Sequence, residues 1–251
     1  AVGAFVGKQD AKRAIERLSA IVKREKISVL APEPGKADLA SVPVTEDMQP
    51  AGAGMAAALG GALGLGLGVL IFLPAVGAIT ALGALASTLF GVGGAVAGGL
   101  AGKAADEALS SGVPADELYI YEDALRRGRI VVIAHVEDDA QKARALEVLD
   151  SCGAESLDAA RENWWVGLRS AEELEYDIPG RTFAADEAIF RQGFEAALDA
   201  KVRGKSYDEA KPRLKERCPA HHVDPGFCRG YERGRAHWRR LADTMSPVEK
   251  S

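Results

Sequence analysis

A long central stretch of the chain, from Ala51 to Gly102, carries no ionisable side chain. It consists almost entirely of Gly, Ala, Leu and Val, and its polar side chains are those of Thr80, Ser87 and Thr88. One helical crossing of a bilayer needs about 20 apolar residues, so this stretch is long enough for two crossings. The sequence therefore predicts a membrane-embedded segment, or the apolar core of an oligomer, between two charged parts.

Pro74 divides this stretch, because proline lacks an amide donor and Gly77 follows it closely. We expect a helical hairpin with helices over residues 54–73 and 78–103. Small residues recur at four-residue intervals, a spacing that lets helix backbones approach closely in lipid. The predicted helix-packing residues are Gly60, Gly64 and Gly68 against Gly91, Ser87 and Gly83, with a second row of Gly94, Gly98 and Gly102 left for a neighbouring copy.

Two alternatives remain open for this stretch, namely a disordered Gly/Ala linker and a buried hairpin inside a large soluble oligomer. Flexible linkers are polar, whereas this stretch is rich in Leu and Val, which favours the membrane hairpin. The net charge of −5 and an aromatic content of 6% argue against a nucleic-acid partner. The expected partners are therefore membrane lipid and further copies of the same chain.

The segments on either side of the hairpin have similar patterns. Residues 2–6 and 27–31 are expected to be strands, joined by an amphipathic helix over residues 10–22 with Asp10 as its cap. Residues 129–136 form a continuous apolar run that is typical of a buried strand. A helix opened by Asp138 and Asp139 follows, with Ala140, Ala143, Leu146 and Leu149 facing one way, and then a fourth strand over residues 154–157.

These patterns predict an α+β fold in which two ferredoxin-like βαβ halves are split by the glycine-zipper transmembrane hairpin. A helical C-terminal region follows. The expected parts are the first half (1–31), a linker (32–50), the hairpin (51–105), the second half (112–160) and the helical region (161–251).

The order of these elements is accompanied by short recognisable motifs. They are Ile27-Ser28-Val29-Leu30, Gly112-Val113-Pro114 and Tyr121-Glu122-Asp123-Ala124-Leu125-Arg126-Arg127-Gly128, which precedes a Val/Ile strand. In this order the chain resembles the bacterial general stress protein 17M-like family over residues 1–160. The resemblance implies a stress-linked, non-catalytic protein of the bacterial inner membrane. Together with the odd number of cysteines, it places both charged parts in the cytoplasm.

The C-terminal region is polar and has helical spacing. Phe183, Phe190, Phe194 and Leu198 form one apolar stripe, and Phe227, Tyr231, Gly234, Trp238 and Leu241 form another. Phe194 and Arg203-Gly204-Lys205-Ser206-Tyr207 resemble the tails of other bacterial stress-response proteins. The arginines at 229, 233, 235, 239 and 240 could face lipid headgroups or form the outer face of a helical bundle. Trp164 and Trp165 could anchor at a bilayer interface or fill a gap between the two units.

Chemistry-bearing residues are sparse. Cys218, His221, His222 and Cys228 are ligand types that zinc prefers, although their spacing matches no standard finger. Zinc, a Cys218–Cys228 disulfide and an unbonded loop remain open as alternatives. No nucleophile–base pattern is visible, so we expect a protein that is not an enzyme.

The leading hypothesis is a membrane-associated homo-oligomer that acts as a scaffold. Two other functions remain open. One is an oligomeric channel, whose lumen would be lined only by the few polar residues of the central stretch. The other is a small-molecule sensor that uses the ferredoxin-like part, which rests on analogy between folds alone.

Overall fold

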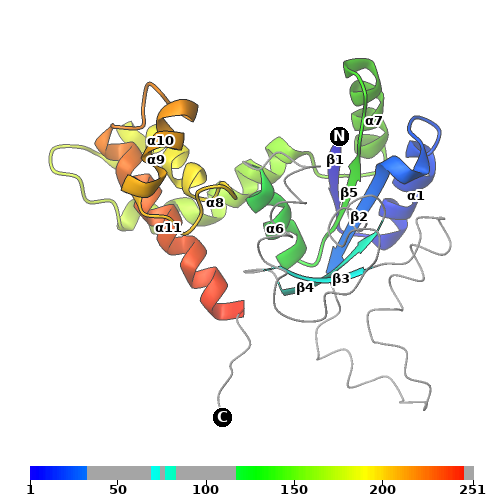
Figure 1. Cartoon of the computed structure of the whole chain (residues 1–251), viewed down its shortest axis with the longest axis horizontal. Helices are drawn as coiled ribbons and strands as arrows, with labels where there is room; N and C mark the ends of the chain where they lie inside the picture. Colours follow the sequence, from blue (N-terminus) through cyan, green and yellow to red (C-terminus); the bar gives the residue numbers. More distant parts are fainter. Residues whose placement is uncertain (33–68, 74–76, 83–116, 246–251) are drawn as a thin grey trace, which may run out of the picture.

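The computed structural model describes residues 1–32, 69–73, 77–82 and 117–245. Within these ranges the chain is a mixed α+β protein. An α+β unit surrounds one antiparallel sheet, and a helical unit of four helices follows it. Helix α6 (Leu118–Arg126) lies between the two units (Figure 1).

The sheet has five strands in the order β1-β5-β2-β4-β3, and each neighbouring pair is antiparallel. All five side chains of β5 are buried, because helices cover both faces of the sheet at this strand, and this explains its unbroken apolar run. The strands predicted at 2–6, 27–31 and 129–136 are confirmed, with slightly different ends. The bounds are β1 (Val2–Phe5), β2 (Ile27–Pro32), β3 (Val69–Leu73), β4 (Gly77–Leu82) and β5 (Ile130–Ala134).

Helices α1 (Lys8–Leu18) and α7 (Asp139–Ser151) cover one face of the sheet, and α6 covers the other. The amphipathic helix predicted over residues 10–22 is present as α1, although it ends at Leu18, and its apolar side chains Ala11, Ala14, Ile15 and Leu18 are all buried. Its predicted cap is wrong. Gly7 occupies the N-cap position, while Asp10 lies in the first turn and pairs with Arg13.

In α7, Asp138 caps the helix as predicted by accepting a hydrogen bond from the Gln141 amide at 2.6 Å. Of the predicted core stripe of this helix, Leu149 is confirmed and the other three residues are wrong. Ala145 and Leu149, one turn apart, face the sheet, whereas Ala140, Ala143 and Leu146 are exposed. The predicted fourth strand is reduced to one bridge between Ala4 and Glu155, because α8 already begins at Leu157.

The central apolar stretch contains the largest error of the sequence analysis. Residues 69–73 and 77–82 are strands β3 and β4, not parts of two helices. The chain does reverse where Pro74 predicts, since Leu73 pairs with Gly77 and Val69 pairs with Ala81. Short apolar runs do not distinguish strand from buried helix, and the open edge of β2 supplies a pairing partner for β4. None of the helices in the described ranges has the length and hydropathy needed to cross a bilayer.

The helical unit consists of α8 (Leu157–Leu174), α9 (Phe183–Ala197), α10 (Tyr207–Arg217) and α11 (Pro225–Met245). Ser156 caps α8, and Ser206 with Glu209 forms a complete capping box at the start of α10. Helices α9 and α11 pack at very short range. A Cβ atom at Gly193 of α9 would lie 2.1 Å from the carbonyl oxygen of Phe227 on α11.

Candidate functional site at the α6 junction

Helix α6 is buried on both sides. Leu118, Tyr121 and Leu125 pack on the sheet, whereas Tyr119 and Ile120 pack against the helical unit. A sequence pattern with apolar residues on several faces gives a helix of this kind, which lies inside a protein rather than on its surface. The junction between α6 and the helical unit is therefore the place where the two halves of the described chain meet (Figure 1).

Trp164 of α8 lies at the centre of this junction. Its ring centroid is 4.8 Å from that of Tyr119 on α6 and 5.8 Å from that of Phe194 on α9. The neighbouring Trp165 packs on Phe190 and Phe194, and its indole N–H donates to Glu187 at 2.9 Å. Both indoles are buried, at 3% and 2% exposed, which confirms the packing alternative for the tryptophan pair.

A buried ion pair crosses the same junction. Glu122 of α6 accepts a hydrogen bond from Arg203, in the segment after α9, at 2.7 Å. The two side chains are only 3% and 5% exposed. The Arg203 guanidinium also donates to the Leu198 carbonyl at 3.1 Å and lies 5.9 Å from the Trp238 ring centroid. Such a pair fixes how the two units dock, because either charge alone would be buried without its counter-ion.

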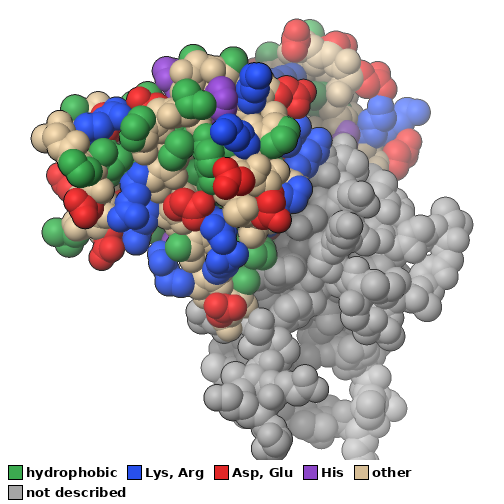
Figure 2. All heavy atoms as spheres, turned by 60° about the vertical axis from the view of Figure 1, so that its left-hand side comes forward, with side chains coloured by type: hydrophobic (Ala, Val, Ile, Leu, Met, Phe, Trp, Pro, Cys, Tyr) green, Lys and Arg blue, Asp and Glu red, His purple; other side chains and the backbone are tan. Residues whose placement is uncertain are grey.

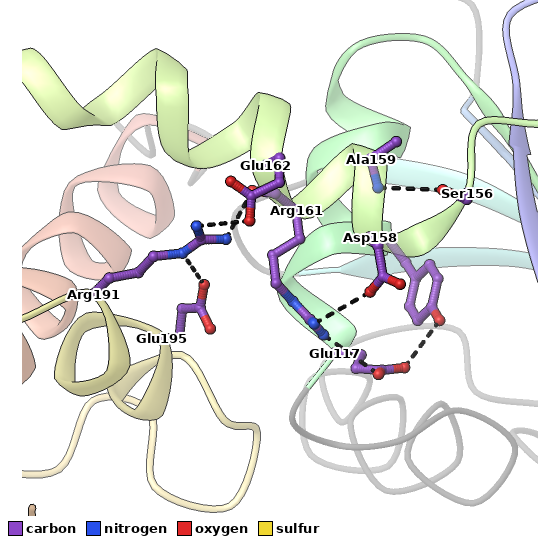
Figure 3. A network of polar contacts seen from close by, with 9 residues as sticks. Glu117, Ser156, Asp158, Ala159, Arg161, Glu162, Arg191 and Glu195 are labelled. Atoms are coloured by element: carbon purple, nitrogen blue, oxygen red, sulfur yellow. Dashed lines mark hydrogen bonds and ion pairs between the residues drawn. The ribbon is translucent and has the colours of Figure 1, made fainter. Parts of the chain in front are cut away.

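A network of ion pairs lies at the edge of the junction, where the start of α6 meets α8 and α9 (Figure 3). Arg161 of α8 reaches Glu117, just before α6, at 3.4 Å. Arg191 of α9 reaches both Glu162 on α8 and Glu195 on its own helix at 2.8 Å. Burial, with a smaller contribution from Glu195, raises the pKa of the nearby Tyr119 hydroxyl far above its ordinary value, so Tyr119 remains neutral.

The side chain of His237 on α11 packs on the same aromatic cluster. Its ring centroid is 5.5 Å from that of Phe194 and 6.4 Å from that of Trp164. Burial lowers the pKa of His237 to about 4, and the charges of Arg240, Arg126 and Arg233 act in the same direction. The imidazole is therefore neutral at pH 7.

The cavity beside His237 has a volume of about 10 Å³, close to what one water molecule needs. It is lined by Tyr119, Glu122, Arg126, Trp164, Leu198, His237, Trp238 and Leu241. A small organic molecule does not fit into this volume. The junction thus serves to dock the two units rather than to hold a substrate.

The predicted metal ligands are near one another in sequence but do not converge. The His222 ring nitrogen Nδ1 lies 3.2 Å from the Cys218 carbonyl oxygen, and the Cys228 thiol donates to the His222 carbonyl at 3.6 Å. His221 is exposed, and Cys218 and Cys228 are both free thiols. Burial raises the pKa of Cys218. Across the described ranges, no group of three or more His, Cys, Asp or Glu side chains is placed to hold a metal ion.

Two arginines of α11 contact α8 and the residue that follows it. Arg233 binds Glu172 of α8 through two hydrogen bonds of 2.6 and 3.1 Å, and Arg229 donates to the Glu175 carbonyl at 2.9 Å. Acidic and basic side chains are interspersed over the visible face of the helical unit (Figure 2). These contacts favour the bundle interpretation of the basic face.

The nine predicted helix-packing residues of the central stretch lie outside the described residues. A different row of close-packed glycines is present in the helical unit, at Gly226, Gly230 and Gly234 of α11. The sequence analysis recognised Gly234 only as a member of an apolar face. Its four-residue interval with Gly230 and Gly226 is the signal that would have identified the row.

The sequence analysis also did not identify Glu122, Arg203 and His237 as parts of one site, since their contacts join segments far apart in the chain. Comparisons with protein-family models, with curated proteins and with solved structures found no match to this chain.

Proposed function

We propose that this protein is a non-enzymatic, membrane-associated scaffold that assembles with further copies of itself through its uncharged central stretch. The α+β unit and the helical unit form its aqueous part, which we place in the bacterial cytoplasm next to the inner membrane. The absence of any ionisable residue between Ala51 and Gly102 supports this proposal. The link to stress conditions comes from the family resemblance alone.

The register of β3 and β4 is the structural observation that carries this proposal. Because Val69 pairs with Ala81, the chain enters β3 and leaves β4 at the same end of the hairpin. This end of the hairpin, at Val69 and Leu82, is where the two uncharged stretches, residues 51–68 and 83–102, follow in the sequence. We propose that they pack on each other and on a second copy through the glycine rows at 60, 64, 68 and at 94, 98, 102.

We further propose that the α+β unit is ferredoxin-like, with the central stretch as an insertion. Strands β1 and β2 are parallel to each other, joined through α1, and β5 lies between them. Helix α7 follows β5, and the bridge from Ala4 to Glu155 extends the same sheet on the outer side of β1. This connectivity supports the proposal, because the ferredoxin-like fold has a split βαβ arrangement of the same kind.

Membrane association is tested with the purified full chain and vesicles of phosphatidylcholine and phosphatidylglycerol. We expect the protein to float with the vesicles and to stay with them after a sodium carbonate wash. Leu63→Glu and Leu89→Glu place a charge in each uncharged stretch and should release the protein. The control is Val166→Glu, at a position on α8 that is 68% exposed, which should float as the wild type does. Wild-type protein that stays in the carbonate supernatant would overturn the proposal.

One observation favours a second function, small-molecule sensing by the α+β unit. A groove of about 350 Å³ lies along the outer side of β1, a volume within the range of ligand pockets. Val2, Leu146, Leu149 and Ala154 give it an apolar lining, and Glu147 and Asp150 give it acidic groups. A third acidic residue of the lining, Glu155, is already paired with Arg129.

This composition suits a small apolar amine. We expect such amines, but not the corresponding neutral amides, to raise the melting temperature of the protein. Leu146→Arg should abolish the rise. Equal effects of amines and amides, or none from either, would exclude this function.

A further inference from the structure

His237 lies where α6 meets the helical unit, and it contacts an aromatic side chain on each of two helices. Its ring packs on Trp164 of α8 and Phe194 of α9. Tyr119, Glu122 and Arg126 of α6 line the same cavity. The imidazole is thus part of the surface on which α6 docks.

In the part of the chain that the structure describes, the cavity beside His237 offers no acidic side chain that could pair with the protonated ring. From α6, Glu122 lines the cavity and is held by Arg203, while Arg126 is a cation paired with Asp123. Tyr119, also on α6, remains neutral. From α8 and α9 the contacts are Trp164 and Phe194, which carry no charge.

From its own helix, His237 is near Arg233 and Arg240. Arg233 is bound to Glu172. An imidazolium at this position would therefore add a positive charge to a site that already contains several arginines.

We propose that His237 is the proton-sensitive element of a latch between α6 and the helical unit: its neutral ring holds the two together, and its protonation releases the helical unit from α6. Release at this surface follows from how α6 is held. Leu118, Tyr121 and Leu125 keep α6 on the sheet through apolar contacts that carry no charge. The opposite side of α6 combines the packing of Tyr119 and Ile120 with the buried Glu122–Arg203 pair, and both lie next to the cavity that His237 lines.

The direction of the pH dependence follows from linkage. The pKa of His237 is lowered from 6.5 to about 4 in the closed form, so the open form binds the proton more tightly. The closed form is therefore fully favoured above pH 6.5 and loses this advantage as the pH falls. The closed-to-open ratio decreases by up to about tenfold per pH unit, by about 160-fold at pH 4, and by about 300-fold in the limit of lower pH.

The experiment follows the purified full chain from pH 7 to pH 4 by hydrogen exchange and by tryptophan fluorescence. All three tryptophans, at 164, 165 and 238, belong to the helical unit, so fluorescence reports on the latch. We expect α6 amides and tryptophan emission to change between pH 6.5 and 4 while β5 amides remain protected. His237→Phe keeps an aromatic ring that cannot be protonated, and it should keep the latch closed at pH values where the wild type is open.

The matched control is His221→Gln, because His221 is exposed in the loop before α11. This variant should open at the same pH as the wild type. If His237→Phe opens at the wild-type pH, or if α6 and β5 lose protection together, the latch is overturned. Should His237→Phe fail to fold, the NMR titration of the wild-type His237 ring decides: an unshifted pKa near 6.5 also overturns it.

Discussion

Gly230 on α11 lies directly against the backbone carbonyl of Phe190 on α9, so closely that a Cβ atom at Gly230 would sit 2.0 Å from that oxygen. Gly234 has the same relationship to the Phe194 carbonyl one turn later, at 2.4 Å. The missing side chains thus let two helix backbones touch. This contact fixes the position of Phe190 and Phe194 on α9. Phe194 in turn packs on Trp164 at the junction.

Gly230→Ala should be strongly destabilising. The methyl group cannot avoid a backbone atom by a change of rotamer, so α9 and α11 must move apart, at a cost of about 2 kcal/mol or more. Gly167→Ala is the matched control, because nothing lies within 4 Å of a Cβ atom at that position of α8. It should stabilise the helix by about 0.5–1 kcal/mol. Urea denaturation of the two variants measures both effects, and equal midpoints would contradict the close packing.

The sequence predicted those elements of the α+β unit for which the hydrophobic pattern or a helix-capping residue gave a clear local signal. The continuous apolar run of β5 and the Asp138 cap of α7 both occur as expected. Strand β3 was not predicted. The run from Val69 to Leu73 is apolar throughout, so it has no hydrophobic periodicity, and its pairing with β4 decides its conformation. The buried face of α7 was also predicted incorrectly. Ala140, Ala143 and Leu146 are in line with Leu149 and equally apolar, but the buried face contains Leu149 and Ala145.

Removing one member of the Glu122–Arg203 pair should destabilise the protein by about 3–5 kcal/mol, because the other charge remains buried. Glu122→Leu and Arg203→Met are the single variants. The double variant removes both charges and should recover much of the loss. A double-mutant cycle measured by urea denaturation gives the coupling energy. If the losses of the two single variants simply add, the pair does not hold α6 in the way described.

The candidate site could not have been predicted from local sequence. Glu122 and Arg203 are separated by 81 positions, and the motif that contains Glu122 suggested only a family resemblance. Whether His237 is neutral depends on burial by rings from α8 and α9, which a helical pattern does not reveal. Helical periodicity did place Phe190 and Phe194 in the core correctly, since their contacts follow from their spacing on one helix.

Glu187 should contribute stability that depends on its charge. The hydrogen bond from Arg169 lowers the pKa of Glu187, burial acts against this, and the Trp165 N–H lowers it further. The stabilisation is therefore present above pH 4.5 and is lost as the pH falls through the lower pKa of the folded state. Glu187→Gln should cost about 1 kcal/mol at pH 7. The melting temperatures of variant and wild type should converge in acid, whereas Glu216→Gln, at an exposed position, should match the wild type throughout.

The glycine rows of the central stretch make a separate prediction about assembly. If copies of the chain pack through these rows as we propose, a leucine at Gly64 or Gly98 would force the packed backbones apart, so each variant should have a lower oligomeric mass in detergent. Gly167→Leu is the control, because α8 has open space at that position and the mass should not change. Native mass spectrometry measures all three variants against the wild type. The same mass for Gly64→Leu, Gly98→Leu and the wild type would show that copies of the chain do not meet through these rows. Self-assembly would then need another surface, even if the protein still floats with vesicles.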